Sequence, residues 1–253
     1  SRRVPALGGE DGYQWGRRGM HKAALAASEK DRLPIVHPNA GSSRIYPKGA
    51  AVLDMMAYTF GEDALRRVIK NYLQKHMYKT VETNDLYLAF QDTLGLSPEW
   101  FFDQWLYKGG EPHYSVSWSK SAVQQGDNVV PSTRVDVDQI HQMDQLTGVF
   151  RMPVVVEVWY KDHTNDRVRV DIATKNVVVQ VPNPGNKPVD FVLFDPGSYI
   201  MKKLTFDKSW DERVSQLRYA RNMIVWIDVF EAMRGDSTRG KQRLEVITFV
   251  LKR

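Results

Sequence analysis

The sequence predicts a multidomain α+β protein, in which a helical region comes first, a small antiparallel β-sandwich follows and helices return at the end. Three successive hydrophobic periods predict this order. Apolar residues recur at helical spacing as far as residue 110, alternate with polar residues from 111 to 207, and return to helical spacing from 208. We therefore expect three domains, at residues 1–110, 111–207 and 208–253.

Amphipathic helices are predicted within the first region. Apolar side chains between residues 62 and 76 repeat every three or four positions, and Gly61 should end the preceding helix as a left-handed cap. Thr83 is expected to cap the next helix, which Gly95 would end. The stripe of the first of these two helices consists of Leu65, Val68, Ile69, Tyr72 and Leu73.

A further helix should start after Ser97, because a capping serine followed by proline suits a helix N-terminus. It should have Pro98 at its first position and extend through Leu106 to Gly109-Gly110. The segment is rich in aromatic residues, which we interpret as core packing rather than as a binding site: Trp100, Phe101, Phe102, Trp105 and Tyr107.

Short alternating runs predict about seven strands, which is typical of a small β-sandwich. Turn-forming residues separate the runs at 125–128, 163–166 and 182–186, so the connections should be hairpins and the pairing antiparallel. The expected strands cover residues 114–118, 133–138, 149–160, 167–172, 176–181, 189–194 and 198–206.

The last region predicts two helices. The first starts at Trp210 and keeps one apolar side as far as Val225, and the second covers residues 238–251 after a break at residues 235–237. Two such helices cannot bury both apolar stripes alone, so we interpret them as the start of a longer α-superhelical array of the HEAT or armadillo kind.

Composition excludes several classes of protein. The chain has no cysteine among its 253 residues, which excludes disulfides and thiolate metal sites. It has no apolar run of about 18 residues, and its start lacks the apolar middle of a signal peptide, so we expect no transmembrane segment here. The net charge is +5, but basic residues stand beside acidic ones, as in residues 62–67, so we expect no nucleic-acid partner. The compartment is not predicted.

No complete catalytic motif is present. The six histidines, at positions 21, 37, 76, 113, 141 and 163, include no HExxH pair, so no zinc site is predicted within the chain. A nucleophile elbow and a glycine-rich phosphate loop are also absent from the sequence.

One series of short marks does carry a resemblance. Tyr46-Pro47-Lys48-Gly49-Ala50 precedes an apolar run, and further marks follow in order as far as residue 118. The series resembles the second half of the catalytic domain of gluzincin zinc aminopeptidases, the aminopeptidase N or membrane alanyl aminopeptidase type. The later marks are Tyr72-Leu73, His76, Tyr78, Thr83, Asp85-Leu86, Trp105 and Gly110-Glu111-Pro112.

The resemblance implies the fold and the activity. Its domain order is a thermolysin-like helical half, a β-sandwich and a helical superhelix, as the three hydrophobic periods indicate independently. It implies a metallo-aminopeptidase that removes N-terminal residues from peptides with zinc. The zinc ligands are expected upstream of this chain, so this chain alone should be inactive, and no metal ligand or other cofactor-binding residue is predicted within it.

Tyr46 is the catalytic candidate, because it matches the tyrosine that stabilises the tetrahedral oxyanion in that family. A phenol suits this task as a neutral, stiff hydrogen-bond donor. Gly49 and Ala50 would let the start of the helix approach its neighbours and hold the hydroxyl, and Lys48 is expected to be a structural or surface cation. The simpler reading makes Tyr46 a packing residue just before a helix.

Two functions therefore remain in view. The first is a portion of a zinc aminopeptidase with peptide substrates. The alternative is a non-catalytic scaffold or interaction module derived from such a peptidase, since open helical arrays offer concave docking surfaces. The preferred N-terminal residue of the substrate and the oligomeric state are not predicted.

Overall fold

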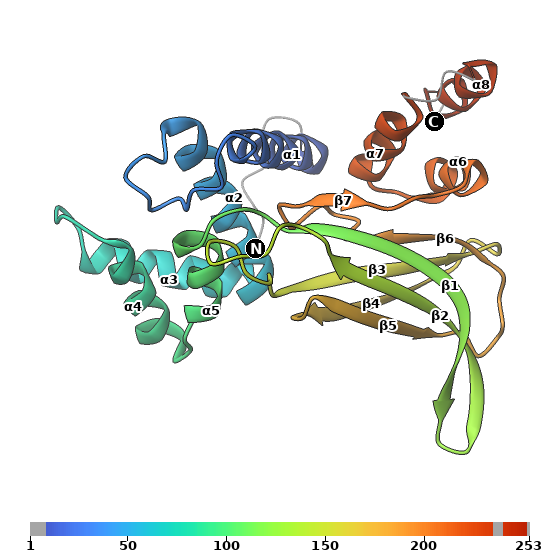
Figure 1. The fold of residues 1–253 in the computed structure, drawn as a ribbon, viewed down its shortest axis with the longest axis horizontal. Coiled ribbons are helices and arrows are strands. Elements are labelled where there is room, and N and C mark those ends of the chain that lie inside the picture. The colour runs from blue at the N-terminus through green and yellow to red at the C-terminus, as the bar shows by residue number, and fades with distance from the viewer. Residues whose placement is uncertain (1–8, 235–239, 252–253) are drawn as a thin grey trace.

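The computed structural model describes residues 9–234 and 240–251, and it confirms the predicted α+β class. Helices α1 to α5 form one end of the molecule, two sheets lie beside them, and α6 to α8 lie over the far end of the sheets (Figure 1). One continuous hydrophobic core connects the first helices with both sheets. The domain boundaries themselves remain a prediction.

Helices α1 (Gly9–Ser28) and α2 (Ser42–Phe60) pack against each other through a buried ion pair. The Arg17 Nε atom lies 2.6 Å from Asp54 Oδ2, and the Arg17 Nη1 atom donates to the carbonyl of Gly197 at 2.9 Å. Tyr13 also donates to Asp54. Arg17 therefore joins α1, α2 and the loop after β6 in one hydrogen-bonded cluster.

The helices α3 (Glu62–Lys75) and α4 (Thr83–Leu94) follow the predicted ranges closely. Gly61 ends α2 with φ 99° and ψ 138°, and Gly95 ends α4 in the left-handed conformation. The predicted cap of α4 was wrong by one residue. Glu82 holds the N-cap position, because its side chain and that of Asp85 form a reciprocal capping box, and Thr83 is the first helical residue.

The predicted helix after Ser97 is divided into two types. Pro98, not Ser97, is the N-cap of α5 (Glu99–Phe102), which continues as the π-helical turn η1 (Asp103–Tyr107). The side chain of Gln104 fixes this turn to the backbone of Arg151. Its Nε2 atom donates to the carbonyl of Arg151, and its Oε1 atom accepts from the backbone amide of Arg151, both at 2.8 Å. Phe101, Phe102 and Trp105 are buried, as predicted, whereas the prediction was wrong for Tyr107, which is 49% exposed.

Two sheets form the sandwich, with strand orders β5-β2-β1-β7 and β4-β3-β6. The pairs within them are antiparallel except for β1 and β7, which are parallel. That exception departs from the predicted hairpin-only pairing, because β7 returns to the edge of the first sheet after crossing from the second. The strands are β1 (His113–Gln125), β2 (Asn128–Gln139), β3 (Met152–Tyr160), β4 (Asn165–Ile172), β5 (Asn176–Pro182), β6 (Val189–Phe194) and β7 (Lys203–Thr205).

The inner faces of the sheets supply the sandwich core. Tyr114 of β1 and Phe194 of β6 face each other across the two sheets, with ring centroids 5.3 Å apart. The last predicted strand, at residues 198–206, is reduced to the three residues of β7, because the segment before it forms a turn around Asp195. Asp195 there accepts hydrogen bonds from the backbone amides of Tyr199 and Ile200, each at 3.0 Å.

The final region contains α6 (Trp210–Tyr219), α7 (Met223–Arg234) and α8 (Gly240–Leu251). The prediction of one helix from Trp210 to Val225 was wrong. The chain leaves the helix at Ala220, whose ψ is 139°, and Asn222 Oδ1 then accepts from the amide of Ile224 at 2.8 Å. The predicted break at 235–237 lies outside the described residues. Ser209 caps α6 through a capping box with Glu212.

Candidate functional site

Tyr46 lies within the second turn of α2, not in front of the helix as predicted. The helix begins at Ser42 and includes Pro47, which has no backbone amide to donate within the helix. The phenol of Tyr46 is 76% exposed and has no hydrogen-bond partner in the described part of the chain. The packing reading therefore does not describe its surroundings.

Two cations fix the opposite side of the same helical turns. Arg44 and Lys48 are both buried, and their spacing of four residues places them on one face of α2. The Arg44 Nη2 atom donates to the carbonyl of Ala27 at 2.8 Å and pairs with Asp31 at 2.5 Å. This face continues into the apolar stripe formed by Ala51, Val52 and Met55.

Lys48 has a complete set of buried partners. Its Nζ atom lies 3.0 Å from Glu111 Oε1 and 3.2 Å from the carbonyl of Gly110. The hydroxyl of Ser28, at the end of α1, donates to the same Glu111 oxygen at 2.6 Å. The structural role expected of Lys48 is therefore confirmed, and Glu111 is its carboxylate partner.

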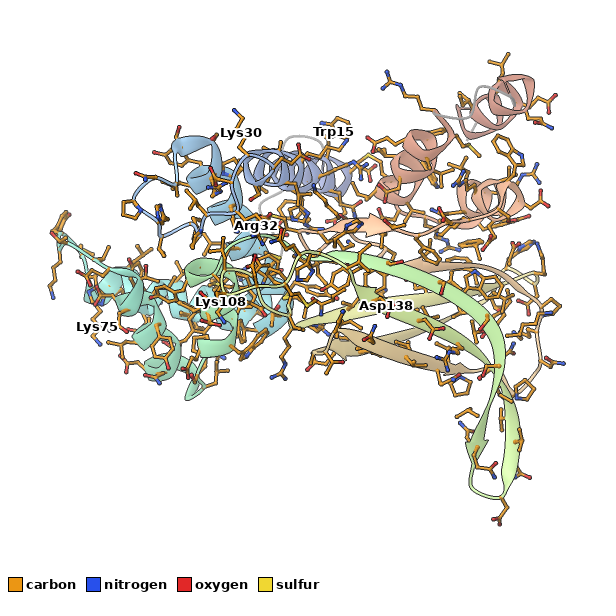
Figure 2. The ribbon with its side chains drawn as sticks, viewed as in Figure 1. Trp15, Lys30, Arg32, Lys75, Lys108 and Asp138 are labelled. Carbon is orange, nitrogen blue, oxygen red and sulfur yellow. The ribbon has the colours of Figure 1, made fainter. Side chains whose placement is uncertain are left out.

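A close backbone approach holds Glu111 in place. The amide of Gly109 donates to the carbonyl of Leu146 at 3.0 Å, and the amide of Gly110 donates to the carbonyl of Arg32 at 3.1 Å. A Cβ atom at Gly109 would lie 1.7 Å from the Arg32 oxygen, so only glycine fits there. Figure 2 shows Arg32 at this junction of the helices and the sheets.

These contacts decide where Tyr46 points. Successive residues of an α-helix are about 100° apart, so Tyr46 lies about 200° from both Arg44 and Lys48. Because those two side chains face the interior, the phenol projects away from it. Gly49 does not contribute by a close approach, since a Cβ there would meet only Ile35 Cδ1, at 3.6 Å. Its expected role in holding the hydroxyl is thus not supported.

Comparison with known proteins identifies this segment. Residues 38–105 match the model of the peptidase family M1 domain. This range includes the helices α2 to α5 and the first part of η1. This segment is similar to part of an M1 peptidase domain. The match contains Tyr46 and Lys48, and it confirms the resemblance to the aminopeptidase N type that the sequence motifs indicated.

Aminopeptidases of other organisms are similar to longer parts of this chain. The chain is 24% identical over 193 residues to probable aminopeptidase 1 of Saccharolobus solfataricus, covering 68% of this chain and 23% of that protein. It is 31% identical over 102 residues to aminopeptidase N of Lactococcus lactis, with 38% and 12% covered. With membrane alanyl aminopeptidase of Heliothis virescens the identity is 22%, over 91% of this chain and 25% of the relative. The chain thus spans about a quarter or less of these relatives.

A solved structure supports the fold alone. The crystal structure of Legionella pneumophila aminopeptidase A in complex with aspartic acid aligns with a TM-score of 0.61 and 10% sequence identity. The alignment covers 75% of this chain and 21% of that one. The similarity in fold therefore extends beyond the segment that the family model matches.

The described residues include no group of three or more histidine, aspartate or glutamate side chains able to hold a metal ion. Tyr72 and His76, two of the sequence marks, are in ring contact at 5.4 Å, and Tyr78 is fully exposed. Within the described ranges, no helix is long and apolar enough to cross a membrane.

Arg44 and Glu111 were missed as determinants of the site. The signal for Arg44 was present, because positions 44, 48, 51, 52 and 55 follow the spacing of one helix face. The prediction that the helix starts after Tyr46 left Arg44 outside the helix, so its place on this face was missed. The partner of Lys48 could not be found from the sequence, since Glu111 is 63 residues away and their meeting depends on the tertiary fold.

Proposed function

We propose that this chain is a portion of a zinc-dependent aminopeptidase acting on peptides, in which the hydroxyl of Tyr46 stabilises the oxyanion of the tetrahedral intermediate. One observation carries the proposal. Within a segment that matches the M1 peptidase domain, a tyrosine without partners projects from a helical turn whose opposite face is fixed by two buried cations.

The chemistry of a phenol fits the role. Its hydroxyl is a donor that stays neutral near pH 7, so it can bind a developing negative charge without an ion-pair partner in the ground state. Catalysis of this kind requires a donor that is oriented before the reaction. The ion pairs of Arg44 and Lys48 supply that orientation by fixing the backbone on either side of Tyr46.

Zinc does not fit the residues described here. They offer no cluster of suitable ligands, so the ligands of the metal would come from other residues of the protein. When bound, zinc supplies Lewis acidity toward a peptide carbonyl. We expect the present chain alone to hydrolyse no substrate.

The test uses the full-length gene product and aminoacyl anilide substrates. Replacing Tyr46 by Phe should lower kcat by about 10²–10³, because one oxyanion donor is lost. Tyr78→Phe is the matched control, since that tyrosine is exposed as well, and it should retain kcat. Near-normal turnover of Tyr46→Phe would remove the catalytic assignment. Absence of any chelator-sensitive activity in the full-length protein would favour the scaffold function instead.

A further inference from the structure

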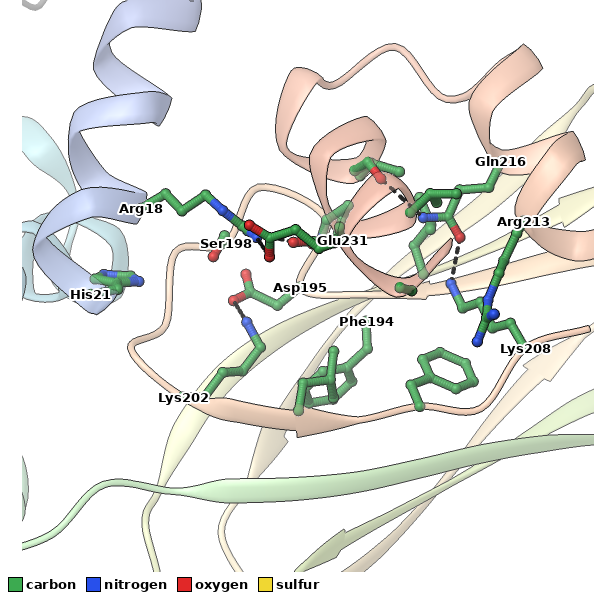
Figure 3. Close-up of a pocket in the computed structure, with 18 of the residues that line it drawn as sticks. Arg18, His21, Phe194, Asp195, Ser198, Lys202, Lys208, Arg213, Gln216 and Glu231 are labelled. Carbon is green, nitrogen blue, oxygen red and sulfur yellow. Dashed lines mark hydrogen bonds and ion pairs between the residues drawn. The ribbon is translucent and has the colours of Figure 1, made fainter. Parts of the chain in front are cut away.

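A cavity far from Tyr46 lies between α1, the β6–β7 segment and the helices α6 and α7 (Figure 3). Its volume is about 380 Å³, within the range of small-molecule sites. Apolar side chains cover part of the wall, and charged groups of both signs surround them. The apolar part includes Leu25, Phe194, Leu204, Phe206, Val225 and Val229.

The cations on one side of the cavity have carboxylate partners. Lys202 Nζ lies 2.5 Å from Asp195 Oδ2, and both side chains are almost fully buried. Arg18 pairs with Glu231 at 2.5 Å and also with Asp228, and Lys22 pairs with Glu231 at 2.6 Å. These groups neutralise one another, so this side has no charge left to offer a ligand.

The cations on the other side have no such partner. Lys208 donates to the neutral side chain of Gln216, with 2.6 Å between Nζ and Oε1, and its ammonium lies 4.5 Å from the centroid of Phe206. The guanidinium of Arg213 has no hydrogen-bond or ion-pair partner in the described part of the chain. Burial lowers the pKa of Lys208 to about 7, because the desolvation of its charge outweighs the opposing effect of the carboxylates of Glu212 and Asp228.

His21 provides a second, independent observation. Its imidazole lines the cavity, is 5% exposed, and has a buried Nε2 atom without a hydrogen-bond partner. Its pKa is lowered to about 3, first by burial and then by the charges of Lys202, Arg17 and Arg18. The ring is therefore neutral at ordinary pH, and its buried nitrogen can take part in a hydrogen bond with a group that enters the cavity.

We propose that this cavity binds a small carboxylate with an apolar body, its carboxylate held by Arg213 and Lys208. An unpartnered guanidinium presents a planar pair of donors that matches a carboxylate, and the adjacent ammonium adds a second charge-assisted contact. The neighbouring apolar wall then suits an aliphatic body. Inorganic phosphate would leave that wall without a partner, so it fits less well. The site is independent of the function proposed for Tyr46.

Isothermal titration calorimetry of this chain at pH 6 with 4-methylpentanoate tests the proposal. Binding should be measurable, and it should weaken about tenfold or more in Arg213→Gln and in Lys208→Met, because a charge-assisted contact is lost. Arg67→Gln is the matched control, since that arginine is exposed on α3 and lies outside the cavity, and it should bind as the unaltered chain does. Circular dichroism confirms that the variants are folded.

The ligand series decides the chemical class. The uncharged 4-methylpentanamide should bind at least tenfold more weakly than the acid, and inorganic phosphate should also bind more weakly. Equal binding of the amide or of phosphate, unchanged binding by Arg213→Gln, or no binding of the acid would overturn the proposal. N-acetyl-Ala-Ala-Leu compared with its C-terminal amide distinguishes a peptide terminus from a free acid as the source of the carboxylate.

Discussion

Two lysines of this molecule have opposite surroundings. Lys48 at the α2 site is fully buried and meets both a carboxylate and a backbone carbonyl. Lys208 at the cavity meets only the amide oxygen of Gln216 and the face of Phe206. A buried cation with an ionic partner fixes local structure, whereas a buried cation without one retains the capacity to bind an anion.

The comparison also separates the two proposals. At the first site the charged groups are satisfied and the functional group is a neutral phenol that faces outward. At the second site the cations themselves are the functional groups. Variants of the first site should therefore change stability or turnover, and variants of the second should change ligand binding.

The largest effect is expected from breaking the first ion pair. Lys48→Met should lower the free energy of unfolding by about 3–5 kcal/mol, because it leaves the carboxylate of Glu111 buried without its cation. Urea denaturation measures the change. The double variant Lys48→Met/Glu111→Leu should recover most of the loss, since no unpaired charge remains. A single variant as stable as the unaltered chain would contradict the structural role.

A second variant tests the backbone that holds Glu111. Gly109→Ala should destabilise the chain by about 1–3 kcal/mol, because the added Cβ would overlap the carbonyl of Arg32 and the backbone must shift. Gly148→Ala is the matched control, since no atom lies within 4 Å of its added Cβ, and its unfolding midpoint should stay close to that of the unaltered chain.

The cavity predicts a pH-dependent stability through His21. Its folded pKa of about 3 lies below its ordinary value of 6.5, so the unfolded chain binds the additional proton between these values. Stability is therefore retained above pH 6.5 and falls as the pH is lowered toward 3. At pH 5 the loss from this residue should be about 2 kcal/mol. His21→Gln should flatten the curve of unfolding free energy against pH, and an unchanged slope would contradict the assignment.

The smallest effect concerns stability at Tyr46. Tyr46→Phe in this chain should change the free energy of unfolding by less than about 0.5 kcal/mol, because the phenol is exposed and has no partner in the described part of the chain. Thermal unfolding checks this. A loss above about 1 kcal/mol would return Tyr46 to the packing role, and would make any loss of turnover in the full-length protein ambiguous.

Local sequence patterns predicted most helices and strands but not the contacts between distant ones. The period of apolar residues located the strands, and the glycine after α4 predicted its end, because these signals act within a few residues. The break at Ala220 was missed because the apolar spacing continues through it. The partner of Lys48, the cavity between α1 and α7, and the parallel edge strand β7 depend on contacts between distant segments, which a single sequence does not encode visibly.

The most direct test of the contrast between the two lysines is an NMR titration of the lysine side chains. One lysine Cε resonance, absent in Lys208→Met, should have its midpoint near pH 7, and 4-methylpentanoate should move that midpoint upward, because a bound anion favours the charged ammonium. A midpoint for Lys208 near the ordinary lysine value of 10.5, unaffected by the acid, would contradict the account.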